Sequence, residues 1–203
     1  QSALLTATGG RNSRLPWLVL EDGGRVCAYL AAYDSLLGKV TPVANLLDYW
    51  VLEAAFKAGQ ALLAQGVPLS LSINLAVSTL IDSRFQLKVG ELLGQHTGLP
   101  PKFLEVELLE TETMNDLSMV AFVMQDLAEM GVQCSIDDFG TGYSSLAYLK
   151  NLPIHKLKID QSFVRDLMTD PNDAAIVRAI LTLGSSLGLQ VIAEGVETDA
   201  QKD

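Results

Sequence analysis

Cysteine and histidine are both scarce in this sequence, with two residues of each among 203. Cys27 and Cys134 lie far apart and form neither a CxxC pair nor the framework of a disulfide-rich secreted domain, so we expect a reducing, cytoplasmic location. His96 and His155 are too few for a histidine-rich zinc site, and they disfavour a Ser/His/Asp triad. These scarcities favour chemistry carried by carboxylates.

Long apolar runs and basic residues are also lacking. No run approaches the roughly 20 residues of a transmembrane helix, and the opening QSALLTATGG has neither the charged nor the apolar region of a signal peptide. We expect a soluble chain, even where a longer protein that contains it is anchored in a membrane. Lysine and arginine number 14 against 24 aspartates and glutamates, and the formal net charge of -10 repels the phosphates of duplex nucleic acid. A phosphate ester would need a cation to mediate its binding.

The sequence is instead rich in alternating strand and helix patterns. Hydrophobic residues make up 49% and charged residues 19%, as in ordinary folded domains. We predict strands over 69–76, 103–110, 132–139, 154–160 and 190–197, and helices over 43–65, 83–95, 116–130, 144–149 and 173–187. Residues 1–203 are interpreted as one α/β domain, with irregular strands over 1–42 and βα repeats over 43–203. Five consecutive units favour a closed, TIM-like (β/α) barrel over an open sheet.

Local signals refine the ends of these elements. Predicted strands over 17–21 and 25–33 flank the turn Asp22-Gly23-Gly24, which indicates a hairpin. Residues of cap type stand at helix ends: Gly131, Gly188, Asp116, and either Asn172 or Asp173. The helix over 43–65 is expected to bury one apolar stripe, made of Leu46, Leu47, Trp50, Val51, Ala54, Ala55, Ala58 and Leu62.

Polar residues alternate with apolar ones along the predicted strands, although strands of a buried parallel sheet are usually apolar throughout. Because the alternation has period two, each strand has one polar face. The polar set comprises Ser70, Ser72, Asn74, Glu105, Glu107, Ser135, Asp137, Lys156, Lys158, Asp160 and Glu194. If the apolar faces meet the helices, these polar faces point into the barrel.

Asn74, Glu107, Asp137, Asp138 and Glu194 would then converge at one mouth of the barrel. Carboxylates so close raise one another's pKa and resist ionisation, and a divalent cation would relieve that repulsion. Carboxylate and amide oxygens suit the hard ions Mg²⁺ or Mn²⁺, and the adjacent aspartates could between them serve two ions. The alternative is a set of solvated strand ends, or structural ion pairs with Lys158. Recurrence on successive strands favours the metal site.

A loop of small residues, 139–145, follows the two aspartates. It matches a dinucleotide-binding loop poorly, because the third glycine is missing and two carboxylates stand where a pyrophosphate would approach. We interpret it as a mobile loop hinged at Gly140 and Gly142 beside the metals. An ordinary βα turn capped by Ser144 is the alternative.

Five short motifs follow one another along the chain: SINL at 72–75, EVELLE at 105–110, DDFGTGYSSL at 137–146, LKID at 157–160 and AEGVET at 193–198. In this order they resemble the EAL domain of bacterial cyclic di-GMP phosphodiesterases. The resemblance covers about residue 45 to the end. It implies a TIM-like barrel, whose last strand would lie beyond Asp203, that hydrolyses cyclic di-GMP to linear pGpG with two Mg²⁺ or Mn²⁺ ions.

The resemblance also implies roles for individual residues. The metal ligands would be Asn74, Glu107, Asp137, Asp138 and Glu194, with Asp137 bridging. Lys158 would orient the attacking water or meet the phosphate, Glu110 would tether the loop at 140–145, and Glu197 would support the site. Expected partners are cyclic di-GMP, a second copy of the chain, and covalently linked sensory or GGDEF-type domains.

The signature Glu-Ala-Leu-x-Arg of that family is replaced here. The best register is Asp34-Ser35-Leu36-Leu37-Gly38, in which Asp34 is a shorter metal ligand and the phosphate-binding arginine is lost. The chain between Gly38 and Trp50 is also shorter than the family pattern. Two hypotheses remain, a metal-dependent phosphodiesterase and a degenerate EAL domain that binds cyclic di-GMP without hydrolysing it. The otherwise intact ligand set favours the enzyme.

Overall fold

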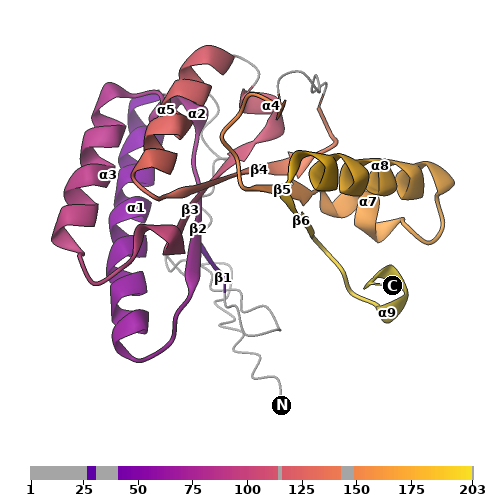
Figure 1. Cartoon of the computed structure of the whole chain (residues 1–203), viewed down its shortest axis with the longest axis horizontal. Coiled ribbons are helices and arrows are strands. Elements are labelled where there is room, and N and C mark those ends of the chain that lie inside the picture. Colours follow the sequence, from indigo (N-terminus) through magenta and orange to yellow (C-terminus); the bar gives the residue numbers. More distant parts are fainter. Residues whose placement is uncertain (1–26, 31–40, 114–115, 143–148, 203) are drawn as a thin grey trace. The chain divides into compact units, whose positions relative to one another are not determined.

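The computed structural model describes residues 27–30, 41–113, 116–142 and 149–202, with side chains from Asp48 onward (Figure 1). It has an α/β architecture in which the strands follow one another through a sheet in the order β1-β2-β3-β4-β5-β6. The pairs β1–β2, β4–β5 and β5–β6 are parallel. The chain forms two compact units, residues 1–106 with 126–133 and residues 107–125 with 134–203.

The first unit contains two strands, the beginning of a third, and their helices. Its elements are β1 (Cys27–Leu30), α1 (Thr41–Ala64), β2 (Ser70–Asn74), α2 (Val77–Leu80), α3 (Ser83–Gln95), the 3-10 helix η1 (Pro101–Phe103) and the first half of β3 (Leu104–Leu109). The helix predicted over 83–95 is confirmed. The short helix α2 carries no signal that we identified in the sequence.

The buried face of α1 matches the predicted stripe only in part: Val51 and Ala55 are buried as predicted. Trp50 is 54% exposed, whereas Leu52 and Phe56, which were outside the predicted stripe, are fully buried. The buried face also includes Asp48, a polar residue whose carboxylate accepts a hydrogen bond from the buried Thr79 hydroxyl. A pattern of apolar residues cannot predict the burial of a polar side chain whose hydrogen-bond partner is distant in the sequence.

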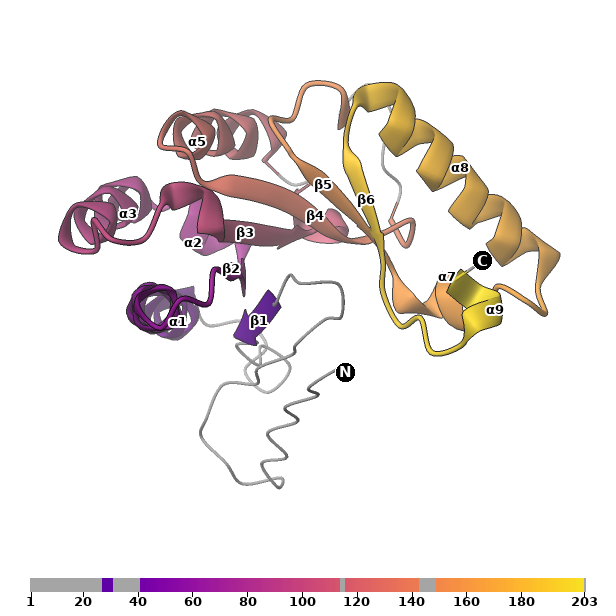
Figure 2. The same ribbon diagram turned by 60° about the horizontal axis from the view of Figure 1, so that its bottom comes forward.

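The second unit contains the rest of β3 and most of the elements that follow. These are α4 (Glu110–Thr113), most of α5 (Leu117–Glu129), β4 (Gln133–Phe139), β5 (Lys156–Ile159), α7 (Gln161–Arg165), α8 (Pro171–Leu187), β6 (Gln190–Ala193) and α9 (Asp199–Lys202). Helix α8 packs along β5 and β6 (Figure 2). Gly184 makes that packing close, since a Cβ there would lie 2.2 Å from Val191 Cγ2.

Several predicted boundaries in this unit need correction. The last strand ends at Ala193 rather than at 197, because Gly195 has φ +72° and turns the chain. Helix α8 begins earlier than predicted, since the Asp170 side chain caps it by accepting from the Asn172 N–H, and neither Asn172 nor Asp173 is the cap. Gly188 ends that helix in the left-handed conformation, as predicted.

Both faces of the central strands are buried, so the polar faces are not the solvated strand ends of the alternative interpretation. Glu107, Asp137 and Lys158 are all at least 90% buried, and so are their apolar neighbours Ile136 and Leu157. The predicted hairpin turn, Asp34 and most of the helix at 144–149 lie outside the described residues. Within the described part of the chain, the helices are all too short or too polar to cross a membrane.

Candidate metal centre

Lys158 lies at the centre of the polar cluster in the second unit. The residue is 1% exposed, and its ammonium Nζ contacts three carboxylates from three different segments. The distances are 2.8 Å to Glu107 Oε2 of β3, 3.0 Å to Asp137 Oδ1 of β4, and 2.7 Å to Glu194 Oε1 just after β6. The ion pairs that we weighed against a metal site are therefore present, and they gather the same carboxylates that the metal hypothesis requires.

A β-bulge brings the two adjacent aspartates into this cluster. Ile136 pairs with Leu157 and Phe139 pairs with Ile159, so β4 has one more residue than β5 between these pairs. Asp138 takes up the irregularity with φ +52°, the one positive φ of a non-glycine residue in the described chain. In a regular strand the two side chains would point to opposite faces, and a bulge re-aims one of them.

Asp137, Asp138 and Glu194 together form an all-oxygen ligand set. Each offers a carboxylate oxygen, and the three oxygens lie within 4.8 Å of one another. Carboxylate oxygens are the donors that Mg²⁺ and Mn²⁺ prefer, so the residues present fit a hard divalent ion. The buried position, with Asp137 only 7% exposed, also means that an unneutralised cluster would be costly.

The carboxyl groups of both aspartates hold their protons more tightly than usual. Burial raises the pKa of Asp137, with Glu194 adding repulsion and Lys158 opposing it. Burial also raises the pKa of Asp138, to about 7, together with repulsion from Asp137 and a hydrogen bond shared with Asp160. Burial is thus the main reason that both carboxyl groups resist ionisation, and repulsion between neighbouring carboxylates adds to it.

Glu110 fastens the loop that follows β4. It opens α4 rather than ending the strand, is 1% exposed, and its Oε2 accepts from the backbone N–H groups of Gly140 at 2.8 Å and Gly142 at 3.0 Å. Backbone N–H groups of the loop are the partners that we expected, but the Thr141 hydroxyl donates instead to the Asp138 carbonyl. Gly142 allows this close approach, since a Cβ there would lie 3.0 Å from the Glu110 carboxyl carbon.

The other predicted site residues have no described contact with this cluster. Asn74 is the half-buried last residue of β2 in the first unit, and its role as a ligand stays a prediction. Glu197 is exposed, and its backbone N–H donates to the Gln201 side chain. Asp34 lies outside the described residues.

Asp160 belongs to the site although sequence reasoning gave it no role. Its carboxylate caps α7 by accepting from the Ser162 N–H at 2.7 Å, and it shares a hydrogen bond with Asp138. Burial acts to raise its pKa, but the hydrogen bonds from Ser162 and Asp138 outweigh this and lower it. The available signal was an aspartate followed by a serine two residues later at the start of a helix.

The family profile named EAL domain matches residues 37–203. The signaling protein YkoW of Bacillus subtilis is 44% identical over 153 residues, which are 75% of this chain and 19% of YkoW. MucR of Pseudomonas aeruginosa, named a bifunctional diguanylate cyclase/cyclic di-GMP phosphodiesterase, is 42% identical over 168 residues, 82% of this chain and 24% of MucR. The chain therefore spans about a fifth to a quarter of the length of these relatives.

Solved structures agree with the sequence matches. The MucR phosphodiesterase in complex with c-di-GMP has a TM-score of 0.75 and 40% identity, covering 80% of this chain and 66% of that one. Klebsiella pneumoniae BlrP1 with manganese and cyclic di-GMP has a TM-score of 0.70 and 30% identity, covering 78% of this chain and 40% of that one. These matches confirm the α/β, TIM-like barrel class. The chain belongs to the EAL domain family.

Proposed function

We propose that this chain is a divalent-metal-dependent phosphodiesterase domain that hydrolyses cyclic di-GMP to linear pGpG. The observation that carries the proposal is the convergence of Asp137, Asp138 and Glu194, with oxygens within 4.8 Å of one another, around the buried ammonium of Lys158. A buried cationic donor beside an anionic ligand set is what a phosphodiester substrate and a hard metal require together. The names of MucR and of its c-di-GMP complex support the choice of substrate.

The carboxylates of Asp137, Asp138 and Glu194 would hold Mg²⁺ or Mn²⁺. Asn74, Glu107 and Asp34 are proposed as the further ligands of a site for two ions. When bound, such ions activate water at neutral pH and stabilise charge on the attacking and leaving oxygens. The manganese complex of BlrP1 supports this choice of metal.

The chain's own residues then have separable tasks. Lys158, a buried ammonium within 3.0 Å of three carboxylates, orients the attacking water or donates to a phosphoryl oxygen as negative charge develops there. Glu110 holds Gly140 and Gly142, and thus keeps the loop after β4 beside Asp137 and Asp138. Glu197 would support the turn that follows Glu194. The 3′ oxygen released from the cleaved phosphodiester leaves as a hydroxyl.

The product of incubation tests this proposal directly. The chain should convert cyclic di-GMP to pGpG in the presence of Mn²⁺, with EDTA stopping the conversion. Asp137→Asn should abolish turnover while the protein stays folded, because it removes a ligand at the centre of the cluster. The matched control is Asp116→Asn, which neutralises an exposed aspartate just before α5 and should retain activity. Equal turnover by Asp137→Asn would contradict the metal assignment.

The second candidate function is a receptor that binds cyclic di-GMP without hydrolysing it. The observation that favours it is the sequence at 34–38, where Asp34 and Gly38 replace the signature glutamate and arginine. Under the enzyme hypothesis, Asp34→Glu should tighten Mn²⁺ binding and raise turnover, since a longer side chain reaches the metal better. Retained ligand binding with no product from either protein would support the receptor.

We infer that the full-length protein joins this domain to sensory or GGDEF-type domains. The much greater length of YkoW and MucR, and the bifunctional name of MucR, support this arrangement. We also propose self-association of the domain, which analytical ultracentrifugation would test. We propose a reducing, cytoplasmic location, which fits the burial of Cys134 in the core.

A further inference from the structure

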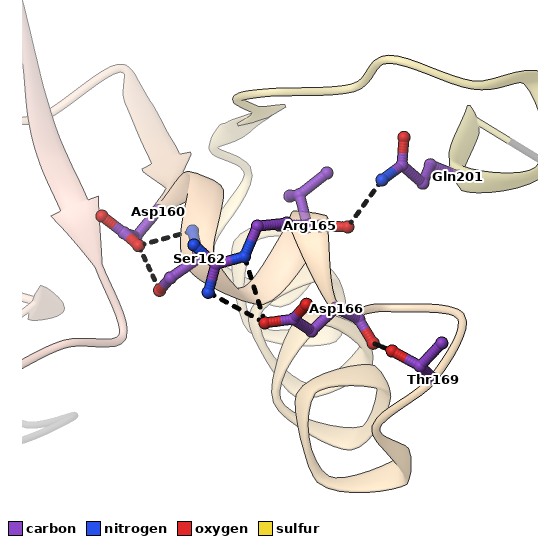
Figure 3. Close-up of polar contacts among 7 residues, drawn as sticks. Asp160, Ser162, Arg165, Asp166, Thr169 and Gln201 are labelled. Atoms are coloured by element: carbon purple, nitrogen blue, oxygen red, sulfur yellow. Dashed lines mark hydrogen bonds and ion pairs between the residues drawn. The ribbon is translucent and has the colours of Figure 1, made fainter.

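Helix α7 connects two parts of the candidate metal centre. At its N-terminal end, Asp160 caps the helix and shares a hydrogen bond with Asp138. At its C-terminal end, the carbonyl of the buried Val164 accepts a hydrogen bond of 3.1 Å from Gln201 Nε2, as Figure 3 shows. One end of this short helix therefore contacts Asp138, and the other contacts the chain segment that follows Glu194.

The Gln201 side chain uses both ends of its amide. Its Oε1 accepts from the backbone N–H groups of Glu197 and Thr198, both at 2.9 Å, and from the Thr198 hydroxyl at 3.1 Å. The Thr198 hydroxyl in turn accepts from the Gln201 N–H at 3.3 Å, which makes a reciprocal capping box at the start of α9. The amide Nε2 then ties this capped turn to α7. Capping uses only the amide oxygen Oε1 of Gln201. The hydrogen bond from Nε2 to the Val164 carbonyl is therefore an interaction that capping does not require.

The segment between Glu194 and the turn has little else to hold it. Residues 195–200 are exposed, and β6 has already ended at Ala193. The Glu194 N–H donates one long hydrogen bond, 3.3 Å, to the Ile159 carbonyl, which continues the β5–β6 pairing by one residue. Gly195 packs closely against α7, since a Cβ there would lie 2.9 Å from Gln161 Cβ. Gln201 thus closes a short segment of exposed chain onto the helix.

We propose that Gln201 is a positioning residue for the metal centre, whose amide strap to Val164 fixes Glu194 relative to Asp138. The proposal rests on the function proposed above and deepens it, because it says what keeps two of the three metal ligands at a constant separation. Gln201 touches neither metal nor substrate. It acts by fixing the backbone after Glu194, whose side chain must reach both Lys158 and the ion.

Two substitutions separate the strap from the cap. Gln201→Met removes the whole amide at similar size, whereas Gln201→Glu keeps the oxygens that accept from Glu197 and Thr198 but loses the donor to Val164. Arg165→Gln and Thr169→Val are matched controls in the same region, since they remove hydrogen bonds to Asp166 that do not reach the turn (Figure 3). All four proteins are compared with the unchanged chain by Mn²⁺ calorimetry and by hydrogen exchange over residues 194–198.

Both Gln201 variants should bind Mn²⁺ about tenfold more weakly, the lower end of the loss seen when outer groups that orient metal ligands are removed. Both should exchange faster over 194–198 while keeping a thermal unfolding midpoint close to that of the controls. Wild-type Mn²⁺ affinity and exchange in Gln201→Glu would overturn the proposal. If the unchanged chain neither binds Mn²⁺ nor hydrolyses cyclic di-GMP, the proposed function is wrong. Separately, unaltered hydrogen exchange over residues 194–198 in the Gln201 variants would overturn the proposed role of Gln201.

Discussion

At the scale of single residues, the proposed chemistry depends on residues in unfavourable states: a non-glycine residue at positive φ, a carboxyl group with a raised pKa, and a buried ammonium. Asp138 sits at positive φ, and its pKa is raised to about 7 because burial and the neighbouring carboxylates disfavour its charge. Lys158 is an ammonium withdrawn almost completely from water. Such residues persist only where the surrounding structure compensates them, and they are characteristic of functional sites.

The raised pKa of Asp138 predicts two opposite responses to pH. Unfolded Asp138 ionises near 3.8, whereas the folded group keeps its proton until about 7. Without metal, the contribution of Asp138 to the free energy of unfolding should therefore fall as the pH rises between these values and stay reduced above them. Mn²⁺ affinity should rise over the same window, because the ion displaces that proton.

Urea unfolding in EDTA and Mn²⁺ titration, each at about pH 5 and about pH 8, would measure both responses. Asp138→Asn should weaken both dependences, and Asp116→Asn should leave them as they are. A pH-independent metal affinity in the unchanged chain would mean that Asp138 is not a ligand.

Replacing Lys158 with methionine should destabilise the fold, because it leaves the carboxylates of Glu107, Asp137 and Glu194 without their ammonium partner. Breaking a buried pair from one side costs about 3 kcal/mol or more of the free energy of unfolding. Added Mn²⁺ should recover part of this loss, since the ion supplies the missing positive charge. Denaturant unfolding with and without Mn²⁺ measures both effects.

The matched control is Lys88→Met, which removes a half-buried pair with Glu53 near the surface and should cost much less stability. If Lys158→Met proved as stable as that control, the three short contacts would not contribute to folding.

At the scale of elements, the site depends on how each strand ends. β4 ends in a bulge, β3 leads directly into α4 through Glu110, and β6 ends one residue before Glu194. Each of these endings changes the direction of a carboxylate. The helices contribute through their caps, with Asp160 at the start of α7 as the clearest case.

Glu110→Ala should loosen the loop after β4 without unfolding the domain, because one carboxylate oxygen accepts from both Gly140 and Gly142. Hydrogen exchange over residues 139–142 should accelerate, and Mn²⁺ affinity should fall as the neighbouring aspartates lose their fixed position. Mass-spectrometric exchange and calorimetry give these two readings. Thr141→Val, which loses only the exposed hydroxyl bond to the Asp138 carbonyl, should have a smaller effect. Identical exchange in the two variants would remove Glu110 from the functional set.

At the scale of the whole molecule, an acidic chain with a formal net charge of -10 is expected to gain stability from the cation that it binds. At a free concentration of one hundred times Kd, an ion bound only by the folded state adds about 2.7 kcal/mol. For a chain of this size that corresponds to about 5–10 °C in the unfolding midpoint. Differential scanning calorimetry should show this increase with Mn²⁺ and its loss on adding EDTA.

The same increase should occur in Asp116→Asn and be absent or much smaller in Asp137→Asn. An undiminished increase in Asp137→Asn would place the bound ion elsewhere on the acidic surface.

Sequence alone determined the family, the order of the strands, and the fact that Glu107, Asp137 and Lys158 lie inside. These follow from local periodicity, because period-two alternation assigns each residue to a face without knowledge of its neighbours. The sequence also predicted the helix over 83–95 and the C-terminal cap at Gly188, because both depend on signals within a few residues.

Tertiary structure alone decided how those side chains meet. Strand periodicity separates Asp137 from Asp138, and only the pairing of β4 with β5 creates the bulge that reunites them. The reach of Lys158 to Glu107, 51 residues away, and of Gln201 to Val164, 37 residues away, depends on contacts between distant segments. Local patterns report which face a residue occupies. The partner that satisfies a buried charge is selected by packing, where leaving that charge unpaired would cost several kcal/mol.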